Sequence, residues 1–130
     1  MLAFLQSRAR SFGYAFSGWW YVIRTQRNAW IHTVVSVTVI LISLWLRISR
    51  TEWALIVLAI AMVWTAEFIN TSLEAVVDLA SRHEQHTLAR VGKDVGAAAV
   101  LIAAGASVVI GLLVLGPALW AKIRLLIPEF

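Results

Sequence analysis

Long apolar segments separated by short polar stretches are the feature that most constrains the fold of this chain. A helix over residues 30–46 would be roughly 26 Å long at about 1.5 Å per residue, just enough to cross the hydrocarbon of a bilayer. Two further spans are expected over residues 53–80 and 95–120, and the second of these is rich in Gly and Ala, which favours a place at the centre of a helix bundle. Because 61% of the 130 residues are hydrophobic and 14% are charged, an ordinary soluble domain is excluded. The sequence therefore predicts one all-α integral membrane domain over residues 1–130, with three transmembrane helices.

Residues 1–28 have a different composition, in which aromatic side chains alternate with arginines. This stretch lacks the clean apolar core and the small-residue cleavage site of a signal peptide. Aromatic rings suit the headgroup depth of a bilayer, and arginines suit water or lipid phosphate. We therefore expect an amphipathic N-terminal helix that lies on the membrane surface.

The basic residues are distributed unevenly between the two sides of the membrane that these spans imply. One side holds the N-terminal segment and the loop between the second and third spans, with seven Lys and Arg residues, and the other side holds four. Cytoplasmic segments of membrane proteins carry an excess of Lys and Arg. The N-terminus is therefore expected in the cytoplasm and the C-terminus outside.

The second span runs into an acidic stretch, AEFINTSLEAVVD, at residues 66–78. On a helix that turns about 100° per residue, its polar side chains would all point within roughly 80° of one another. These side chains are Glu67, Asn70, Glu74 and Asp78. Each carboxylate would cost several kcal/mol if it faced lipid or a dry core. We therefore expect a functional polar face at one end of this helix.

Carboxylates in this arrangement suit the chemistry of magnesium and phosphate. Mg²⁺ normally takes one or two carboxylates and fills its other positions with water and substrate phosphates. A further carboxylate can accept the proton of an attacking hydroxyl, and Asn70 can hold that hydroxyl or the phosphate in line. Lys93, expected in the loop before the third span, can neutralise phosphate charge, and Asp94 can cap the helix or contact a second metal or a ribose. Together these residues suggest phosphoryl transfer from a soluble nucleotide to a lipid hydroxyl.

Two other uses of the acidic face are open on sequence alone: a path for ions or protons, and pairing with arginines between subunits. A conductor needs ionisable side chains through the whole membrane, whereas the third span has none between Asp94 and Lys122. His83 and His86 are expected in solvent, and His32 is expected to hydrogen-bond at the interface rather than to bind a metal. No Walker A, GxGxxG or protein-kinase motif is present, so a nucleotide site must be of another kind.

The acidic stretch resembles the signature of a known family. EFINTSLEAVVD at residues 67–78, followed by KDVGAA at residues 93–98, is similar to the motif of the prokaryotic diacylglycerol kinases, a family that includes the undecaprenol kinases. GYAFSG at residues 13–18 and RNAWIH at residues 27–32 extend the resemblance over nearly the whole chain. RNAWIH and EFINTS look somewhat more like the undecaprenol kinases.

The resemblance implies a lipid kinase that uses ATP and Mg²⁺ to phosphorylate the hydroxyl of undecaprenol or diacylglycerol. It also implies a homotrimer in a bacterial inner or plasma membrane, with active sites shared between neighbouring subunits at the cytoplasmic face. By position, Glu74 would bind the metal of MgATP, Glu67 would be the base for the lipid hydroxyl, and Asn70 would lie between them. The residues expected to contact the nucleotide are Tyr14, His86, Lys93 and Asp94, with Tyr14 near the adenine.

Gln26 departs from the family pattern, in which a second metal-binding carboxylate lies near the end of the surface helix. An amide oxygen can coordinate Mg²⁺ but supplies no charge, so weaker metal binding is expected. A catalytically inactive member of the family is therefore an alternative to an active kinase.

Overall fold

The computed structural model of the protein describes residues 1–82, 84 and 86–126. These residues form helices and no strand. The helices are α1 (Leu2–Thr25), α2 (Arg27–Leu46), α3 (Arg50–Ser81) and α4 (Thr87–Leu126). Within the described residues α2, α3 and α4 are long and apolar enough to cross a membrane. The predicted all-α membrane fold is therefore confirmed, while the division of residues 1–130 into a surface helix and three spans in one domain stays a prediction.

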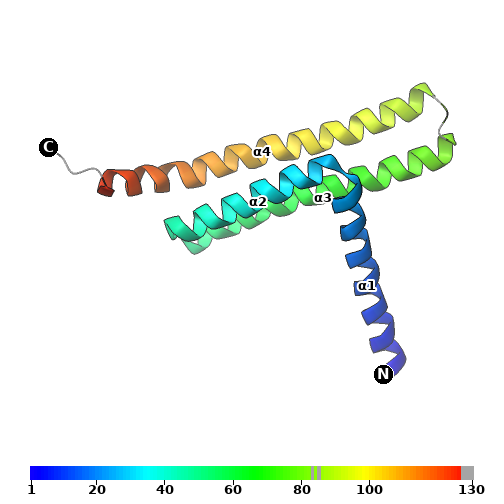
Figure 1. Ribbon diagram of the computed structural model, residues 1–130, viewed down its shortest axis with the longest axis horizontal. Helices are drawn as coiled ribbons and strands as arrows, with labels where there is room; N and C mark the ends of the chain where they lie inside the picture. Colours follow the sequence, from blue (N-terminus) through cyan, green and yellow to red (C-terminus); the bar gives the residue numbers. More distant parts are fainter. Residues whose placement is uncertain (83, 85, 127–130) are drawn as a thin grey trace.

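The three long helices lie side by side, and α1 projects away from them (Figure 1). α3 and α4 run antiparallel and form the closest helix pair, and α2 packs against both. Gln26 is the residue between α1 and α2, and its extended backbone (φ −100°, ψ 119°) interrupts the helix there. A chain that would otherwise continue as one long helix therefore changes direction at Gln26.

Among the described residues, six of the ten buried apolar side chains gather in two clusters, and the partly buried Ile60 packs against both. Val22, Ala29 and Trp64 make one cluster near the α1–α2 junction. The other cluster, made by Ile48, Ile56 and Val114, lies where α2 turns into α3. Many other large apolar side chains of the helices are exposed on the surface of the chain. Such a surface suits a chain surrounded by lipid, where helices associate by close van der Waals packing.

The turn between α2 and α3 is closed by local hydrogen bonds. Arg47 ends α2 with a left-handed backbone (φ 54°). Ser49 then caps α3: its backbone N–H donates to Glu52 Oε2 at 2.6 Å, and its Oγ accepts from the Glu52 backbone N–H at 3.3 Å. This reciprocal pair satisfies two donors that a helix start otherwise leaves open. Lys122 of α4 donates to the Trp45 carbonyl at 2.5 Å, so the far end of α4 is also fixed to this turn.

α4 begins at Thr87, eight residues before the expected start of the third span at Val95. Lys93 was expected in the loop before the third span, but both Lys93 and Asp94 lie within α4. The expected start of the helix was placed where the apolar run begins. A helix can, however, extend beyond the hydrocarbon of the membrane when pairs of polar side chains stabilise it. Arg90 and Asp94, four residues apart, form such a pair at 3.6 Å.

α4 was expected at the centre of the helix bundle because of its small residues. Within this chain, however, α3 is the most buried of the three long helices. At Gly105, Gly111 and Gly116, nothing lies within 4 Å of the place where a Cβ would stand. At Gly96, by contrast, a Cβ would collide with the Asn70 side chain of α3. Only part of the small-residue surface is therefore used for packing within the chain.

Candidate active site

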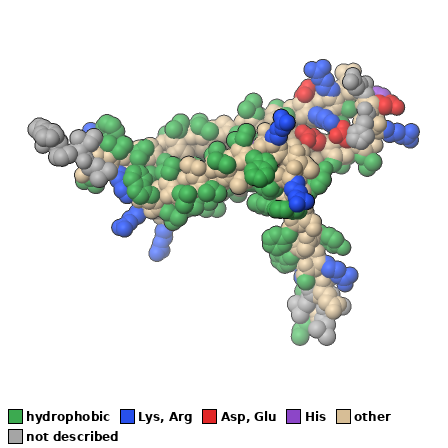
Figure 2. Space-filling view, in the orientation of Figure 1, with side chains coloured by type: hydrophobic (Ala, Val, Ile, Leu, Met, Phe, Trp, Pro, Cys, Tyr) green, Lys and Arg blue, Asp and Glu red, His purple; other side chains and the backbone are tan. Residues whose placement is uncertain are grey.

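The polar side chains of α3 share one face, as their spacing predicted, and their exposure increases along it. Glu67 and Asn70 are buried, with 1% and 6% of their surface exposed. Glu74 and Asp78, one and two turns further on, are half-buried. On the face seen in Figure 2, acidic side chains gather at the end where α3 meets α4. The same helix therefore holds one carboxylate in a closed environment and two in an open one.

Two amides hold the Glu74 carboxylate. Asn70 Nδ2, one turn earlier on α3, donates to Glu74 Oε1 at 3.0 Å. Gln26 Nε2, at the α1–α2 junction, donates to Glu74 Oε2 at 3.3 Å. The structure thus brings Gln26 to the predicted metal-binding carboxylate, although the two residues are 48 positions apart. Glu74 connects the junction of α1 and α2 to the polar face of α3.

Asn70 has a second, unfilled side. Its Oδ1 is buried and has no hydrogen-bond partner among the described residues. This atom lies where a Cβ on Gly96 would stand, and that Cβ would also approach Leu73 at 3.2 Å. Glycine therefore lets α4 come close to the polar face. Gly96 was not among the predicted site residues, although its place three residues after Lys93 in the family motif was a usable signal.

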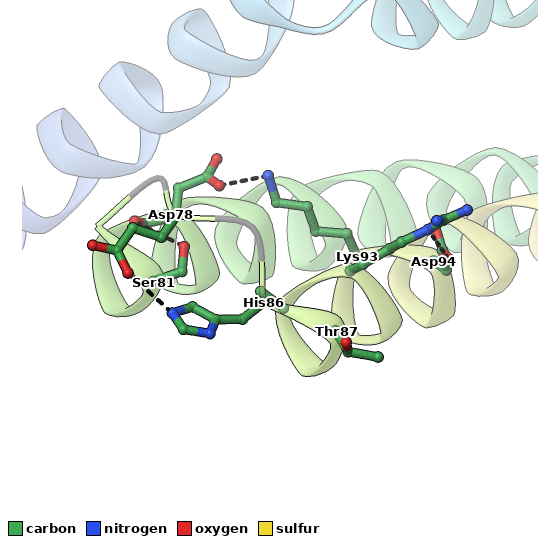
Figure 3. Close-up of a pocket in the computed structure, with 9 residues that line it drawn as sticks. Asp78, Ser81, His86, Thr87, Lys93 and Asp94 are labelled. Carbon is green, nitrogen blue, oxygen red and sulfur yellow. Dashed lines mark hydrogen bonds and ion pairs between the residues drawn. The ribbon is translucent and has the colours of Figure 1, made fainter.

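Lys93 of α4 reaches across to Asp78 of α3, with its Nζ 2.5 Å from Asp78 Oδ1 (Figure 3). Both side chains are a little over one-third exposed, at 39% and 35%. They line a pocket of about 750 Å³ between the end of α3 and the start of α4. Pockets for drug-sized ligands and cofactors fall in the range of roughly 300–1,000 Å³. The pocket therefore has the volume for a nucleotide and places an ammonium group at its edge.

Asp94 and His86 line the same pocket as Lys93. Asp94 pairs with Arg90 and is largely exposed, and His86 Nε2 lies 3.4 Å from Glu84 Oε2. Tyr14, three-quarters exposed on α1, is not among the residues that line this pocket. The structure therefore brings together His86, Lys93 and Asp94 but leaves Tyr14 apart from them. His83 lies outside the described residues.

Glu67 lies deeper along the same face and has a different neighbour. Its Oε2 is 3.8 Å from Nε2 of His32 on α2. Neither atom has a hydrogen-bond partner within the described part of the chain. The expected interfacial hydrogen bond of His32 is therefore not made through this nitrogen. The proximity of His32 to Glu67 was not predicted, because it depends on how α2 packs on α3.

The oxygen ligands available at Glu74 suit a cation that binds together with phosphate better than a metal ion held by the protein alone. The described residues contain no group of three or more His, Cys, Asp or Glu side chains able to hold a metal ion. One carboxylate from Glu74 and the amide oxygen of Gln26 nevertheless match Mg²⁺, which takes most of its other oxygen ligands from water and phosphates. Gln26 directs its NH₂ group at Glu74. Its amide must therefore rotate to offer oxygen to a metal.

Comparison with known proteins now adds to this geometry. Residues 13–115 match the family described as prokaryotic diacylglycerol kinase. The chain belongs to this family. The predicted family is therefore confirmed, and the matched range includes all the predicted site residues. The family is one of lipid kinases, so the predicted enzyme class, a phosphotransferase, agrees with it.

Relatives within the family carry two different names. The diacylglycerol kinase of Synechocystis sp. is 43% identical over 101 residues, which cover 78% of this chain and 58% of that protein. The undecaprenol kinase of Bacillus subtilis is 36% identical over 110 residues, covering 85% of this chain and 89% of that protein. The diacylglycerol kinase of Escherichia coli K12 is 34% identical over 84 residues, covering 59% and 68%. The chain thus spans just over half the length of the Synechocystis relative, and the names of its relatives leave the lipid open.

Proposed function

We propose that the protein is an ATP-dependent kinase that phosphorylates the hydroxyl of a membrane lipid at the cytoplasmic face of a bacterial inner or plasma membrane. The observation that carries this proposal is the pair of contrasting carboxylates on α3. Glu67 is buried, and its Oε2 has no hydrogen-bond partner among the described residues. Glu74 is half-buried, accepts from two amides, and lies one turn before Asp78, which lines the pocket with Lys93. Such a difference in environment suits two roles: accepting a proton and binding a cation with phosphate. Membership of a lipid kinase family supports the same conclusion.

The nucleotide would lie at the open end of the polar face. Glu74 and Gln26 would hold Mg²⁺, which when bound neutralises charge on the phosphate oxygens. Lys93 would leave Asp78 to bind a phosphate, because an ammonium is attracted more strongly by the several charges of ATP than by one carboxylate. Asp94 and His86, from the same pocket, would contact the rest of the nucleotide.

The lipid hydroxyl would meet the γ-phosphate at the closed end. Glu67 accepts the hydroxyl proton as a bond forms between the hydroxyl oxygen and the γ-phosphorus. The bond from that phosphorus to the β–γ bridging oxygen breaks, and ADP leaves with the electron pair. Asn70, between the two carboxylates, keeps the reacting groups in line. Because Glu67 Oε2 has no hydrogen-bond partner in the described part of the chain, this oxygen can take the proton.

We further propose a homotrimer with active sites shared between subunits, and an orientation with the N-terminus in the cytoplasm. Tyr14 does not line the pocket of its own chain, so the expected adenine contact would come from the α1 of a neighbour. The free glycine positions on α4, Gly105, Gly111 and Gly116, offer a surface where another helix could approach closely. The orientation follows from the excess of Lys and Arg on the side of the pocket.

One observation favours a second candidate, a family member that binds nucleotide without turnover. Gln26 supplies no charge beside Glu74, so the cation would be bound by a single carboxylate. An ion or proton conductor gains no such support, because α3 has no acidic residue between Glu52 in its first turn and Glu67.

A direct assay tests the proposed function. The purified protein in mixed micelles is given radiolabelled ATP, Mg²⁺ and one of undecaprenol, diacylglycerol or ceramide, beside the Glu67→Gln variant. The proposal predicts a phosphorylated lipid with undecaprenol or diacylglycerol from the wild-type protein alone. Product from none of the lipids, with ATP still bound, would instead support the inactive alternative.

A further inference from the structure

His32 and Glu67 lie next to each other on α2 and α3 without a hydrogen bond between them. His32 Nε2 lies 3.8 Å from Glu67 Oε2, which is beyond hydrogen-bond reach. Both atoms are shielded from solvent, and neither is hydrogen bonded within the described residues. The Glu67 side chain is 1% exposed and that of His32 is 14% exposed. Buried polar atoms nearly always have a partner, so this pair calls for a third group.

Aromatic packing holds His32 in this position. The edge of its ring meets Trp64 of α3, with ring centroids 6.3 Å apart and planes at 69°. Trp64 is itself fixed on two sides: it stacks on Trp19 of α1 at 4.9 Å, and its Nε1 donates to Ser36 Oγ at 3.3 Å. Packed side chains of α1 and α3 therefore fix the ring of His32 beside Glu67.

A hydroxyl group can form hydrogen bonds with both His32 Nε2 and Glu67 Oε2. It has one O–H donor and two acceptor lone pairs, so it can serve a carboxylate and an N–H at once. An oxygen placed beside the line between the two atoms reaches both at about 2.8 Å. Glu67 Oε2 would accept from the O–H, and His32 in its Nε2–H tautomer would donate to the oxygen. Neither a carbonyl nor a hydrocarbon group could satisfy both atoms.

We propose that His32 is the second hydrogen-bonding partner of the lipid alcohol and positions its oxygen for attack on the γ-phosphate. This inference rests on the proposed function, in which Glu67 accepts the proton of that alcohol. With the N–H of His32 on one lone pair and Glu67 on the proton, the other lone pair of the alcohol oxygen is directed at phosphorus. His32 would thus distinguish an alcohol from the rest of a lipid headgroup.

The test compares two variants of His32 with a matched control on the same helix. His32→Leu removes both nitrogens, and His32→Gln keeps an N–H donor at a shorter reach. Thr33→Val, at the next position of α2, removes a hydroxyl whose hydrogen bond is made within the same helix, to the Ala29 carbonyl. The probes are dioctanoylglycerol and undecaprenol in mixed micelles at saturating MgATP, and the KM for MgATP is measured separately.

His32→Leu is expected to lower kcat/KM for the lipid about tenfold to a hundredfold, because a site built to hydrogen-bond a hydroxyl loses a partner. In His32→Gln, kcat/KM for the lipid should fall by only about threefold, and in Thr33→Val it should stay within about twofold of wild type. The KM for MgATP should stay within about twofold for all three variants, because the nucleotide lies at the other end of the polar face.

Several results would overturn the role of His32. They are an unchanged kcat/KM in His32→Leu, an equal loss in His32→Gln and His32→Leu, and a parallel rise in the KM for MgATP. Circular dichroism and size-exclusion chromatography report folding; if His32→Leu fails to fold, wild-type lipid kinetics in His32→Gln would overturn the role. A wild-type protein without phosphorylated product overturns the proposed function instead, so the two failures are distinct.

Discussion

Lys93 of α4 and Asp78 of α3 form an ion pair at 2.5 Å at the edge of the nucleotide-sized pocket. The pair joins α3 and α4, the two helices that pack most closely. Asp78 lies before the segment that connects these helices, and Lys93 lies after it. In the proposed function it is a resting arrangement, because the ammonium of Lys93 is the group that would move to phosphate. The first prediction follows from this exchange.

Lys93→Gln is expected to raise the KM for MgATP about tenfold or more, since a charge-assisted contact with phosphate is lost. The KM for the lipid should change little, because Lys93 lies away from Glu67. Lys122→Gln, at the opposite end of α4, removes the same charge and serves as the control. Equal effects of the two substitutions on MgATP would argue against a nucleotide contact at Lys93.

Gln26→Glu is expected to lower the Mg²⁺ concentration needed for half-maximal activity by about threefold to tenfold. When no cation is bound, a second carboxylate would repel the Glu74 carboxylate. When Mg²⁺ is present, the second carboxylate would bind it more tightly than an amide does. Gln6→Glu adds the same charge to α1 away from the site and controls for net charge. A Mg²⁺ titration of lipid phosphorylation checks this, and an unchanged requirement in Gln26→Glu would contradict the account of Gln26.

Gly96→Ala is expected to destabilise the protein by about 1–3 kcal/mol, because the added methyl group would force Asn70 or α4 to shift. It should also reduce activity, since Asn70 holds Glu74. Gly92→Ala is the matched control one turn earlier on α4, where a Cβ would meet Val77 at an ordinary 3.5 Å. Thermal unfolding in detergent compares the two, and equal midpoints would show that Asn70 is not closely packed against α4.

The sequence was sufficient for those parts of the site that lie on one helix. Residue spacing alone put Glu67, Asn70, Glu74 and Asp78 on one face, because the turn of an α-helix is fixed by its backbone hydrogen bonds. The long apolar runs likewise indicated α2, α3 and α4. The start of α4 was less predictable, because the end of an apolar run and the end of a helix have different physical causes.

Contacts between helices could not be obtained from spacing. The pairs Gln26–Glu74, His32–Glu67 and Lys93–Asp78 depend on how α2, α3 and α4 pack, which small local side-chain shapes decide. The family resemblance assigned Gln26 and Glu74 to one metal site, but the hydrogen bond between them and the pairing of Lys93 with Asp78 come from the structure. Tyr14 marks the remaining limit, because its expected contact requires a second subunit.

The central claim is that Glu74 binds the cation with its nucleotide while Glu67 takes the proton, and one paired measurement tests it most directly. Equilibrium binding of MgATP and single-turnover lipid phosphorylation are measured in Glu67→Gln and Glu74→Gln. The account predicts that Glu67→Gln binds MgATP within about threefold of wild type but transfers phosphate at least about a hundredfold more slowly. Glu74→Gln should bind MgATP about tenfold or more weakly. Wild-type turnover in Glu67→Gln, or wild-type MgATP affinity in Glu74→Gln, would contradict this division of roles.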